Sequence, residues 1–271
     1  MYNVLSIAGS DSSGGAGIQA DLKAFAANGV YGMTVITAVT AQNTRGVNAV
    51  RVLDPEIVTA QIDAVFSDIR VDAVKIGMLA DSRIISEVAE ALRRWKPPVT
   101  VLDPVMVAKS GHRLLAPDAE ESLKNKLLPL ADLVTPNLPE AESLSGLEIE
   151  SADTAVLEKA ARRILELGAG AVLIKGGHSD NSDSSTDILV DRHGTRHYTA
   201  PRLEARHTHG TGCSLSSALA ALLARGFGLE QSVTWAKAYI NEGIAHGLAI
   251  GGGCGPIHHF YSLYGGEELE P

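Results

Sequence analysis

Three charged residues each follow a short apolar run that has the character of a β-strand. They are Asp103 after residues 99–102, Glu140 after 133–134, and Lys175 after 172–174. Mg²⁺ prefers oxygen ligands and keeps several waters, so two such carboxylates could hold it together with phosphates. Structural roles stay open, because Glu140 suits the first turn of a helix, Asp103 suits a turn, and Lys175 alone could be a solvated lysine. The joint placement of the two acids favours a metal site.

A glycine turn at residues 209–214 stands directly ahead of an apolar helical stripe. Backbone N–H groups of Gly210, Thr211 and Gly212, with the positive end of the helix dipole, would favour an anion there. That anion could be the charge that develops on a phosphoryl group during transfer. We predict an anion hole, with a packing turn and an inert Cys213 as the alternative.

Cys213 also allows a different chemistry. A helix N-terminus lowers the pKa of a thiol, and His207 and His209 are close in sequence, as a thiol hydrolase would require. Closeness in sequence is weak support for a catalytic pair, so this interpretation stays a minor one.

A second glycine-rich turn, residues 9–17, follows the first strand-like run and opens a helix with Ile18, Leu22 and Phe25 on one face. It matches the dinucleotide fingerprint Gly-x-Gly-x-x-Ala over residues 15–20. The fingerprint also needs an acid about twenty residues further on for the ribose, and none occurs between Lys23 and Asp54. Without that acid, a dinucleotide oxidoreductase becomes a minor alternative. The turn is not a Walker loop either, because it lacks the Lys-Ser or Lys-Thr that follows the glycines there.

The elements that must position these residues alternate along the chain. Strand-like runs at 4–7, 73–76, 99–102, 133–134 and 172–174 are separated by helical patterns, which predicts an α/β fold with a mostly parallel sheet. Residues 186–190 and 195–199 flank a turn and predict an added antiparallel hairpin. A polar loop is expected at 178–185, and two helices should close the chain. We expect one domain over residues 1–271.

Composition narrows the class of protein. The chain has 23 lysines and arginines against 32 acids, a net charge of −9, and 4% aromatic residues, so nucleic acid is an unexpected partner. We find neither a basic leader nor a long apolar run, and expect no membrane association. Two cysteines are too few for a disulfide framework, which favours the reducing cytoplasm.

Taken together, six segments resemble the hydroxymethylpyrimidine/phosphomethylpyrimidine kinases of the ribokinase superfamily. They are residues 8–21, 40–46, 75–79, 103–106, 135–141 and 208–213. The resemblance implies a three-layer ribokinase-like fold, ATP and Mg²⁺ as cosubstrate and cofactor, and a homodimer. It implies that Gly210, Thr211 and Gly212 form the anion hole and that Cys213 stands where related sugar kinases have an aspartate base.

The resemblance also assigns further residues. It puts Gln42, Gly9, Asp21, Met78 and Val105 around the substrate ring, Asp103 and Glu140 with the metal and phosphates, and Lys175, Thr208, Lys237 and Asn241 along the nucleotide. His258 and His259 lack an identifiable third metal ligand and are expected to be structural.

The substrate of this branch is 4-amino-5-hydroxymethyl-2-methylpyrimidine, phosphorylated twice. The amide of Gln42 offers a donor and an acceptor to an aminopyrimidine, whereas relatives that act on pyridoxal tend to have an apolar residue there. Pyridoxal kinase activity and a nucleotide-binding protein without turnover remain alternatives.

Overall fold

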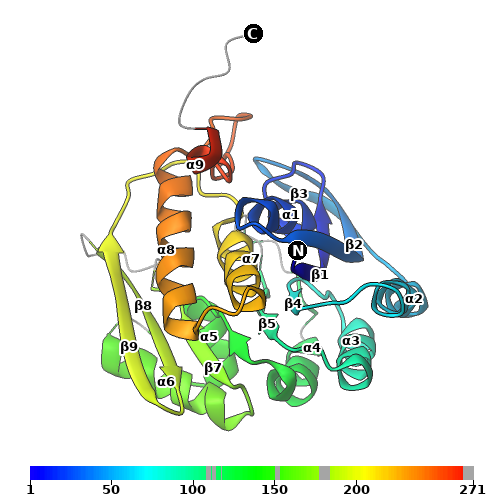
Figure 1. The fold of residues 1–271 in the computed structure, drawn as a ribbon. Helices are drawn as coiled ribbons and strands as arrows, with labels where there is room; N and C mark the ends of the chain where they lie inside the picture. The colour runs from blue at the N-terminus through cyan, green and yellow to red at the C-terminus, as the bar shows by residue number, and fades with distance from the viewer. Residues whose placement is uncertain (108–110, 112–113, 117, 150–152, 177–183, 265–271) are drawn as a thin grey trace.

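The computed structural model in Figure 1 describes residues 1–107, 111, 114–116, 118–149, 153–176 and 184–264. Most of the polar loop expected at 178–185 lies outside these residues. Nine strands form one sheet in the order β3-β2-β1-β4-β5-β6-β7-β8-β9. The strands are β1 (Asn3–Asp11), β2 (Tyr31–Asn43), β3 (Gly46–Val52), β4 (Ala73–Ile76), β5 (Thr100–Leu102), β6 (Leu133–Val134), β7 (Ala171–Ile174), β8 (Ser184–Asp191) and β9 (Gly194–Pro201).

The pairing of the strands confirms the predicted parallel sheet. Strands β2, β1, β4, β5, β6 and β7 run parallel to their neighbours, whereas β3, β8 and β9 join the two edges in antiparallel fashion. The predicted hairpin is the pair β8–β9, which is coloured yellow in Figure 1. Because neighbouring parallel strands point the same way, their carboxyl ends meet along one edge of the sheet.

Helices cover both faces of the sheet and give the expected three layers (Figure 1). The helices are α1 (Gly17–Ala27), α2 (Pro55–Phe66), α3 (Ser82–Trp95), α4 (Ala119–Ser122), α5 (Leu138–Ser145), α6 (Thr154–Glu166), α7 (Thr211–Ala224), α8 (Leu229–Ala245) and α9 (Tyr261–Tyr264), with irregular turns at Leu123–Leu127 and Leu128–Leu130. Side chains of α1, α7 and α8 share one apolar core with the sheet, and those of α2, α3, α5 and α6 share the other.

The apolar pattern of the sequence explains these layers. Alternate residues of the buried strands face opposite cores, so that Val4 packs toward α7 while Leu5 packs toward α2 and α3. On α3, the residues spaced three and four apart, Ile85, Val88 and Leu92, are all buried, as predicted.

Three expectations were incomplete or wrong. The long antiparallel pair β2–β3 was not foreseen, because residues 31–52 mix polar and apolar residues on a half-exposed edge. Leu22 was expected to share one helix face with Ile18 and Phe25, but it is 37% exposed whereas those two are buried. A short helix, α9, follows the two helices that were expected to close the chain.

Candidate active site

A cavity of ≈ 1270 Å³ opens where the parallel strands end and α7 begins. Its wall takes residues from the ends of β1, β2, β5 and β7, from the first turn of α7, and from α8. The position agrees with the rule that open α/β sheets bind ligands at the carboxyl ends of their strands. All but one of the predicted site residues line this cavity.

The first turn of α7 is a tight glycine turn built against the first glycine-rich loop. Gly210 caps the helix with a φ of 80°, and a Cβ atom on it would lie 1.8 Å from the carbonyl oxygen of Gly15. Only glycine tolerates both conditions. The turn therefore aims the N-terminus of a 14-residue helix into the cavity, as an anion hole requires.

Lys175 stands in front of this turn between two acids. Its Nζ lies 2.9 Å from Oδ1 of Asp103 and 4.0 Å from Oε2 of Glu140. A Cβ on Gly212 would lie 3.4 Å from the same Nζ. The positive charge, the two carboxylates and the helix N-terminus thus share one end of the cavity. Asp103 and Glu140 supply carboxylate oxygens, the ligand type that Mg²⁺ prefers, and in this structure Lys175 lies beside both.

The electrostatics of these acids follow from burial. Desolvation raises the pKa of Glu140 to about 7, although Lys175 and the backbone N–H groups of Asn137 and Met106 work in the opposite direction. Glu140 also completes a capping box with Asn137 at the start of α5, which confirms the structural interpretation of this acid alongside its place in the cavity.

The pKa of Cys213 differs from the expectation that the helix N-terminus lowers it. Burial raises the pKa of its thiol to about 11, and the charges of Asp21 and Asp103 add to this effect while Lys75 opposes it. The thiol is therefore protonated at neutral pH, and the helix N-terminus does not make it a resting thiolate. A thiol hydrolase is also disfavoured, because the His209 ring contacts Asp11 and Gln42 and the His207 ring accepts from the Gly255 N–H.

Asp21 is the predicted site residue that does not line the cavity. It has no exposed surface and lies beneath the floor, where it accepts hydrogen bonds from Ser6 at 2.6 Å and Ser217 at 2.8 Å and pairs with Lys75 at 2.9 Å. The prediction that Asp21 lines the ring pocket was wrong, because the residue is fully buried and is not part of the cavity wall. Lys75, which the sequence analysis did not assign, lines the cavity in its place.

The other predicted ring residues gather at the end of the cavity formed by β1 and β2. Gly9, Gln42, Met78 and Val105 all line it. A Cβ on Gly9 would lie 2.9 Å from Sδ of Met78, so glycine keeps this wall open. The backbone of Gln42 is fastened to Ser12 by hydrogen bonds of 2.8 and 2.9 Å, which holds the end of β2 in place.

The predicted nucleotide residues also belong to the cavity wall. Thr208, Lys237 and Asn241 line the cavity with Lys175. Lys237 is held by Asp187 of β8, whose other carboxylate oxygen accepts from the backbone N–H of Gly176 at 2.9 Å. Asp187 thereby connects α8 to the end of β7.

Comparison with known proteins supplies the family. The family model described as phosphomethylpyrimidine kinase matches residues 11–258. The hydroxymethylpyrimidine/phosphomethylpyrimidine kinase of Escherichia coli is 50% identical over 264 residues, which are 97% of this chain and 98% of that protein. The chain belongs to the phosphomethylpyrimidine kinase family.

Solved structures agree with this membership. The phosphomethylpyrimidine kinase of Clostridium difficile is 48% identical, with a TM-score of 0.79 over 89% of this chain and 99% of that one. A Bacillus subtilis pyridoxal kinase, solved as an ADP complex, is 36% identical, with a TM-score of 0.89 over 96% of this chain and 98% of that one. The fold is thus shared by phosphomethylpyrimidine kinases and pyridoxal kinases, and sequence separates them.

Sequence reasoning missed three residues of this family member's site. Lys75 carried a usable signal, because a lysine inside a buried apolar strand needs a partner. Asp11 and Asp187 carried none, since their partners His209 and Lys237 are distant in sequence.

Among the described residues, no group of three or more His, Cys, Asp and Glu side chains is arranged around a metal position, and no helix is long and apolar enough to cross a membrane.

Proposed function

We propose that this protein transfers the γ-phosphoryl group of ATP to the hydroxymethyl group of 4-amino-5-hydroxymethyl-2-methylpyrimidine, and then to the resulting monophosphate, in thiamine biosynthesis. The observation that carries the proposal is that one cavity combines a family-typical anion hole with Gln42, an amide suited to an aminopyrimidine. The printed activity of the E. coli relative supports the same reaction.

The anion hole and its charges do most of the chemistry. Gly210, Thr211 and Gly212 present backbone N–H groups to the transferred phosphoryl group, and Lys175 adds a positive charge beside them. Asp103 and Glu140 would hold Mg²⁺, which would supply positive charge to the phosphates. An ion pair of 2.9 Å between Nζ of Lys175 and Oδ1 of Asp103 holds the ammonium in front of the helix N-terminus.

Cys213 acts on the hydroxyl of the substrate. Because the thiol is protonated in the resting protein, its main role is to orient the hydroxyl, and it takes the hydroxyl proton only in the small fraction of molecules whose thiol has already lost its own proton to solvent. The transition state of phosphoryl transfer is loose and demands positioning more than a strong base, so a weakly ionised thiol suffices.

Binding of the two substrates divides along the cavity. Gln42, Gly9, Met78 and Val105 surround the pyrimidine, and Lys175, Thr208, Lys237 and Asn241 follow the nucleotide, consistent with the wall residues. The cavity volume of ≈ 1270 Å³ leaves room for a monophosphate in the second round. The ADP complex of the similar pyridoxal kinase supports nucleotide use.

The competing proposal is a pyridoxal kinase, which the similarity to the B. subtilis structure favours. The test incubates the purified protein with ATP, Mg²⁺ and either the aminopyrimidine or pyridoxal, and follows products by mass spectrometry. We expect mono- and then diphosphorylated pyrimidine. Product from pyridoxal alone would refute the proposal, and no product from either would favour a non-catalytic nucleotide-binding protein.

A matched variant tests the role of Gln42. Gln42→Leu keeps the volume and removes both hydrogen-bonding groups, so kcat/KM for the pyrimidine should fall about tenfold or more while KM for ATP is preserved. Unchanged pyrimidine kinetics would refute this substrate assignment.

We further propose that residues 1–271 act as one kinase domain, as a homodimer in the cytoplasm. The single nine-stranded sheet supports one domain, and Cys213 and Cys254, which are not joined by a disulfide, suit a reducing compartment. Light scattering after size exclusion tests the dimer: a monomer mass across the working concentration range would refute it.

A further inference from the structure

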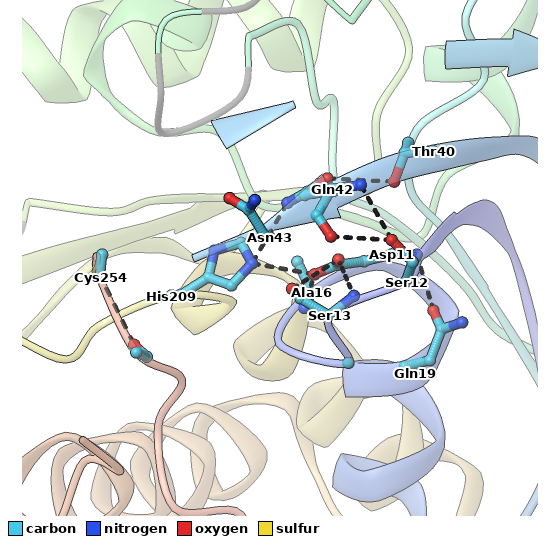
Figure 2. A network of polar contacts seen from close by, with 12 residues as sticks. Asp11, Ser12, Ser13, Ala16, Gln19, Thr40, Gln42, Asn43, His209 and Cys254 are labelled. Carbon is cyan, nitrogen blue, oxygen red and sulfur yellow. Dashed lines mark hydrogen bonds and ion pairs between the residues drawn. The ribbon is translucent and has the colours of Figure 1, made fainter. Parts of the chain in front are cut away.

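The side chains of Asp11 and Gln42 both contact one nitrogen of a distant residue, Nε2 of His209 (Figure 2). Oδ2 of Asp11, at the end of β1, lies 2.9 Å from it. The side-chain amide of Gln42, near the end of β2, lies 3.3 Å from it. All three residues line the cavity. One ring nitrogen can serve a carboxylate and an amide only if its proton is placed correctly.

The carboxylate of Asp11 decides where that proton is. Asp11 is almost fully buried and accepts hydrogen bonds from the N–H and hydroxyl of Ser13 and from the N–H of Ala16, at 2.7–2.8 Å. Burial opposes its ionisation, but these bonds and the one to His209 outweigh burial and lower its pKa. An ionised carboxylate only accepts, so Nε2 of His209 must carry a hydrogen and donate it to Asp11.

The His209 ring is fixed in this position. A Cβ on Gly15 would lie 2.2 Å from Cδ2 of the ring, so the loop backbone packs directly against its face. The backbone N–H of His209 donates to the carbonyl of Gly255 at 3.0 Å. The ring therefore cannot turn aside to suit Gln42, and Gln42 must adapt to the ring.

The amide of Gln42 has two orientations of nearly equal shape. In the structure its nitrogen is next to His209 and its oxygen is 3.3 Å from the hydroxyl of Thr40. That orientation sets an N–H donor of Gln42 against the Nε2–H of His209. It also asks the single hydroxyl hydrogen of Thr40 to serve Gln42 as well as the carbonyl of Ser10, which lies at 2.9 Å.

A half-turn of the amide removes both conflicts. The Nε2–H of His209 then donates mainly to Asp11 at 2.9 Å and is shared with the Gln42 oxygen at 3.3 Å, while the NH₂ group of Gln42 donates to Thr40, whose own hydrogen goes to Ser10. We propose that His209, held by Asp11, is a specificity-positioning residue that fixes the Gln42 amide with its oxygen toward His209 and its NH₂ group toward Thr40. This inference rests on the proposed function and deepens it.

Fixing the Gln42 amide also fixes where its donor and its acceptor face the substrate ring. An aminopyrimidine shows an amine donor next to a ring-nitrogen acceptor, which pairs with an amide in one orientation only. A free amide could turn to accept other patterns, whereas a fixed one rejects them because its own groups would be left unpaired.

The kinetic test is a double-mutant cycle between His209 and Gln42. His209→Leu removes the donor, and His209→Gln is the matched control that keeps an N–H donor within reach of Asp11. We expect His209→Leu to raise KM for the aminopyrimidine about tenfold with KM for ATP unchanged, and His209→Gln to recover most of the loss. In a Gln42→Ala background His209→Leu should add almost nothing, because its effect passes through the amide.

A substrate lacking the amine separates positioning from general damage. With 5-hydroxymethyl-2-methylpyrimidine, His209→Leu should change KM much less than with the aminated ring. Additive effects in the cycle, or equal losses for both substrates, would overturn the inference.

A spectroscopic test remains valid even if His209→Leu fails to fold. Long-range proton–nitrogen NMR of the ring-labelled wild-type protein should find a hydrogen on Nε2 of His209, and a ring protonated on Nδ1 alone would overturn the inference. A wild-type protein that phosphorylates neither pyrimidine would refute the proposed function itself, a result distinguishable from either outcome above.

Discussion

The ammonium of Lys175 lies 2.9 Å from the carboxylate of Asp103, although 72 residues separate them in the chain. Burial alone would lower the pKa of Lys175, but the charges of Asp103 and Glu140 outweigh it and raise that pKa. One cation at the end of β7 thus stabilises carboxylates that come from β5 and α5.

Replacing this lysine tests its role in catalysis. Lys175→Met keeps the length of the side chain and removes the charge, so kcat/KM should fall about a hundredfold or more because the phosphoryl group loses electrostatic stabilisation. Steady-state kinetics with ATP and the pyrimidine measure this. Lys159→Met, on the exposed face of α6, is the control and should match the wild type. A loss below threefold would contradict the role.

Two glycines of the anion hole should respond differently to alanine. Gly210→Ala puts a Cβ 1.8 Å from the Gly15 carbonyl at a φ of 80°, so the free energy of unfolding should fall by about 2 kcal/mol or more. The Cβ of Gly212→Ala would lie 3.4 Å from Lys175 Nζ and 3.9 Å from Asp103 Oδ2, so this variant should fold normally, yet lose about tenfold or more in kcat as the methyl group crowds the phosphoryl position. Urea denaturation and kinetics check both. Equal stabilities would contradict the close contact with Gly15.

The raised pKa of Cys213 predicts a slow thiol. In a Cys254→Ala background it is the one cysteine of the chain, and its alkylation by iodoacetamide should accelerate about tenfold for each pH unit between pH 7 and 10. Mass spectrometry follows the modified protein. A rate that levels off below pH 8 would show a resting thiolate instead.

Glu140 should give the enzyme a pH limit on the acid side. Its pKa is raised to about 7, so it is protonated at pH 6 and charged at pH 8, and only the charged form serves a metal ion. We expect kcat/KM to rise through about pH 7 at limiting Mg²⁺, and a higher Mg²⁺ concentration to move this rise to lower pH because the metal competes with the proton for the carboxylate. Glu140→Gln keeps an oxygen for the capping box and should lose this limb along with most activity. A wild-type profile without an inflection near pH 7 would contradict the assignment.

His259 should make the fold sensitive to acid. Its ring contacts the hydroxyl of Ser214 at 2.8 Å, and burial lowers its pKa to about 4 from 6.5. Below pH 6.5 the His259 ring binds a proton in the unfolded chain but stays neutral in the folded protein. The free energy of unfolding therefore falls as the pH drops toward 4, by up to roughly 3 kcal/mol. Denaturant unfolding of the wild type and His259→Gln should converge as the pH falls. Parallel curves would contradict this source of acid sensitivity.

The fold was predictable where the pattern was strongest. Buried parallel strands such as β7 are continuous apolar runs in the sequence, and the spacing along α3 marks its buried face. The β2–β3 pair lies at an edge of the sheet where buried, half-buried and exposed residues are mixed, so its sequence has no clear period. Edge strands are specified by pairing with a partner, which a single sequence does not display.

The site was predictable where residues act locally and was missed where they act through distant partners. Gly210 and Gly212 could be recognised because a glycine turn ahead of a helix has a local physical meaning. Asp21 was misassigned because whether a carboxylate faces a cavity or lies beneath it depends on Ser6, Lys75 and Ser217, which come from three other elements. The same reason hid the link between Asp11 and His209.

The hydrogen bond between Ser217 and Asp21 also shows how late in synthesis the active site can be completed. Asp21 leaves the ribosome early, whereas Ser217 belongs to α7, 196 residues later. A nascent chain that ends before α7 has the acids, Lys175 and the loops of the first strands, but it has no helix to complete the floor or to form the anion hole. Phosphoryl transfer therefore begins only when the last fifth of the polypeptide has docked, and shorter products of interrupted translation are inert toward ATP.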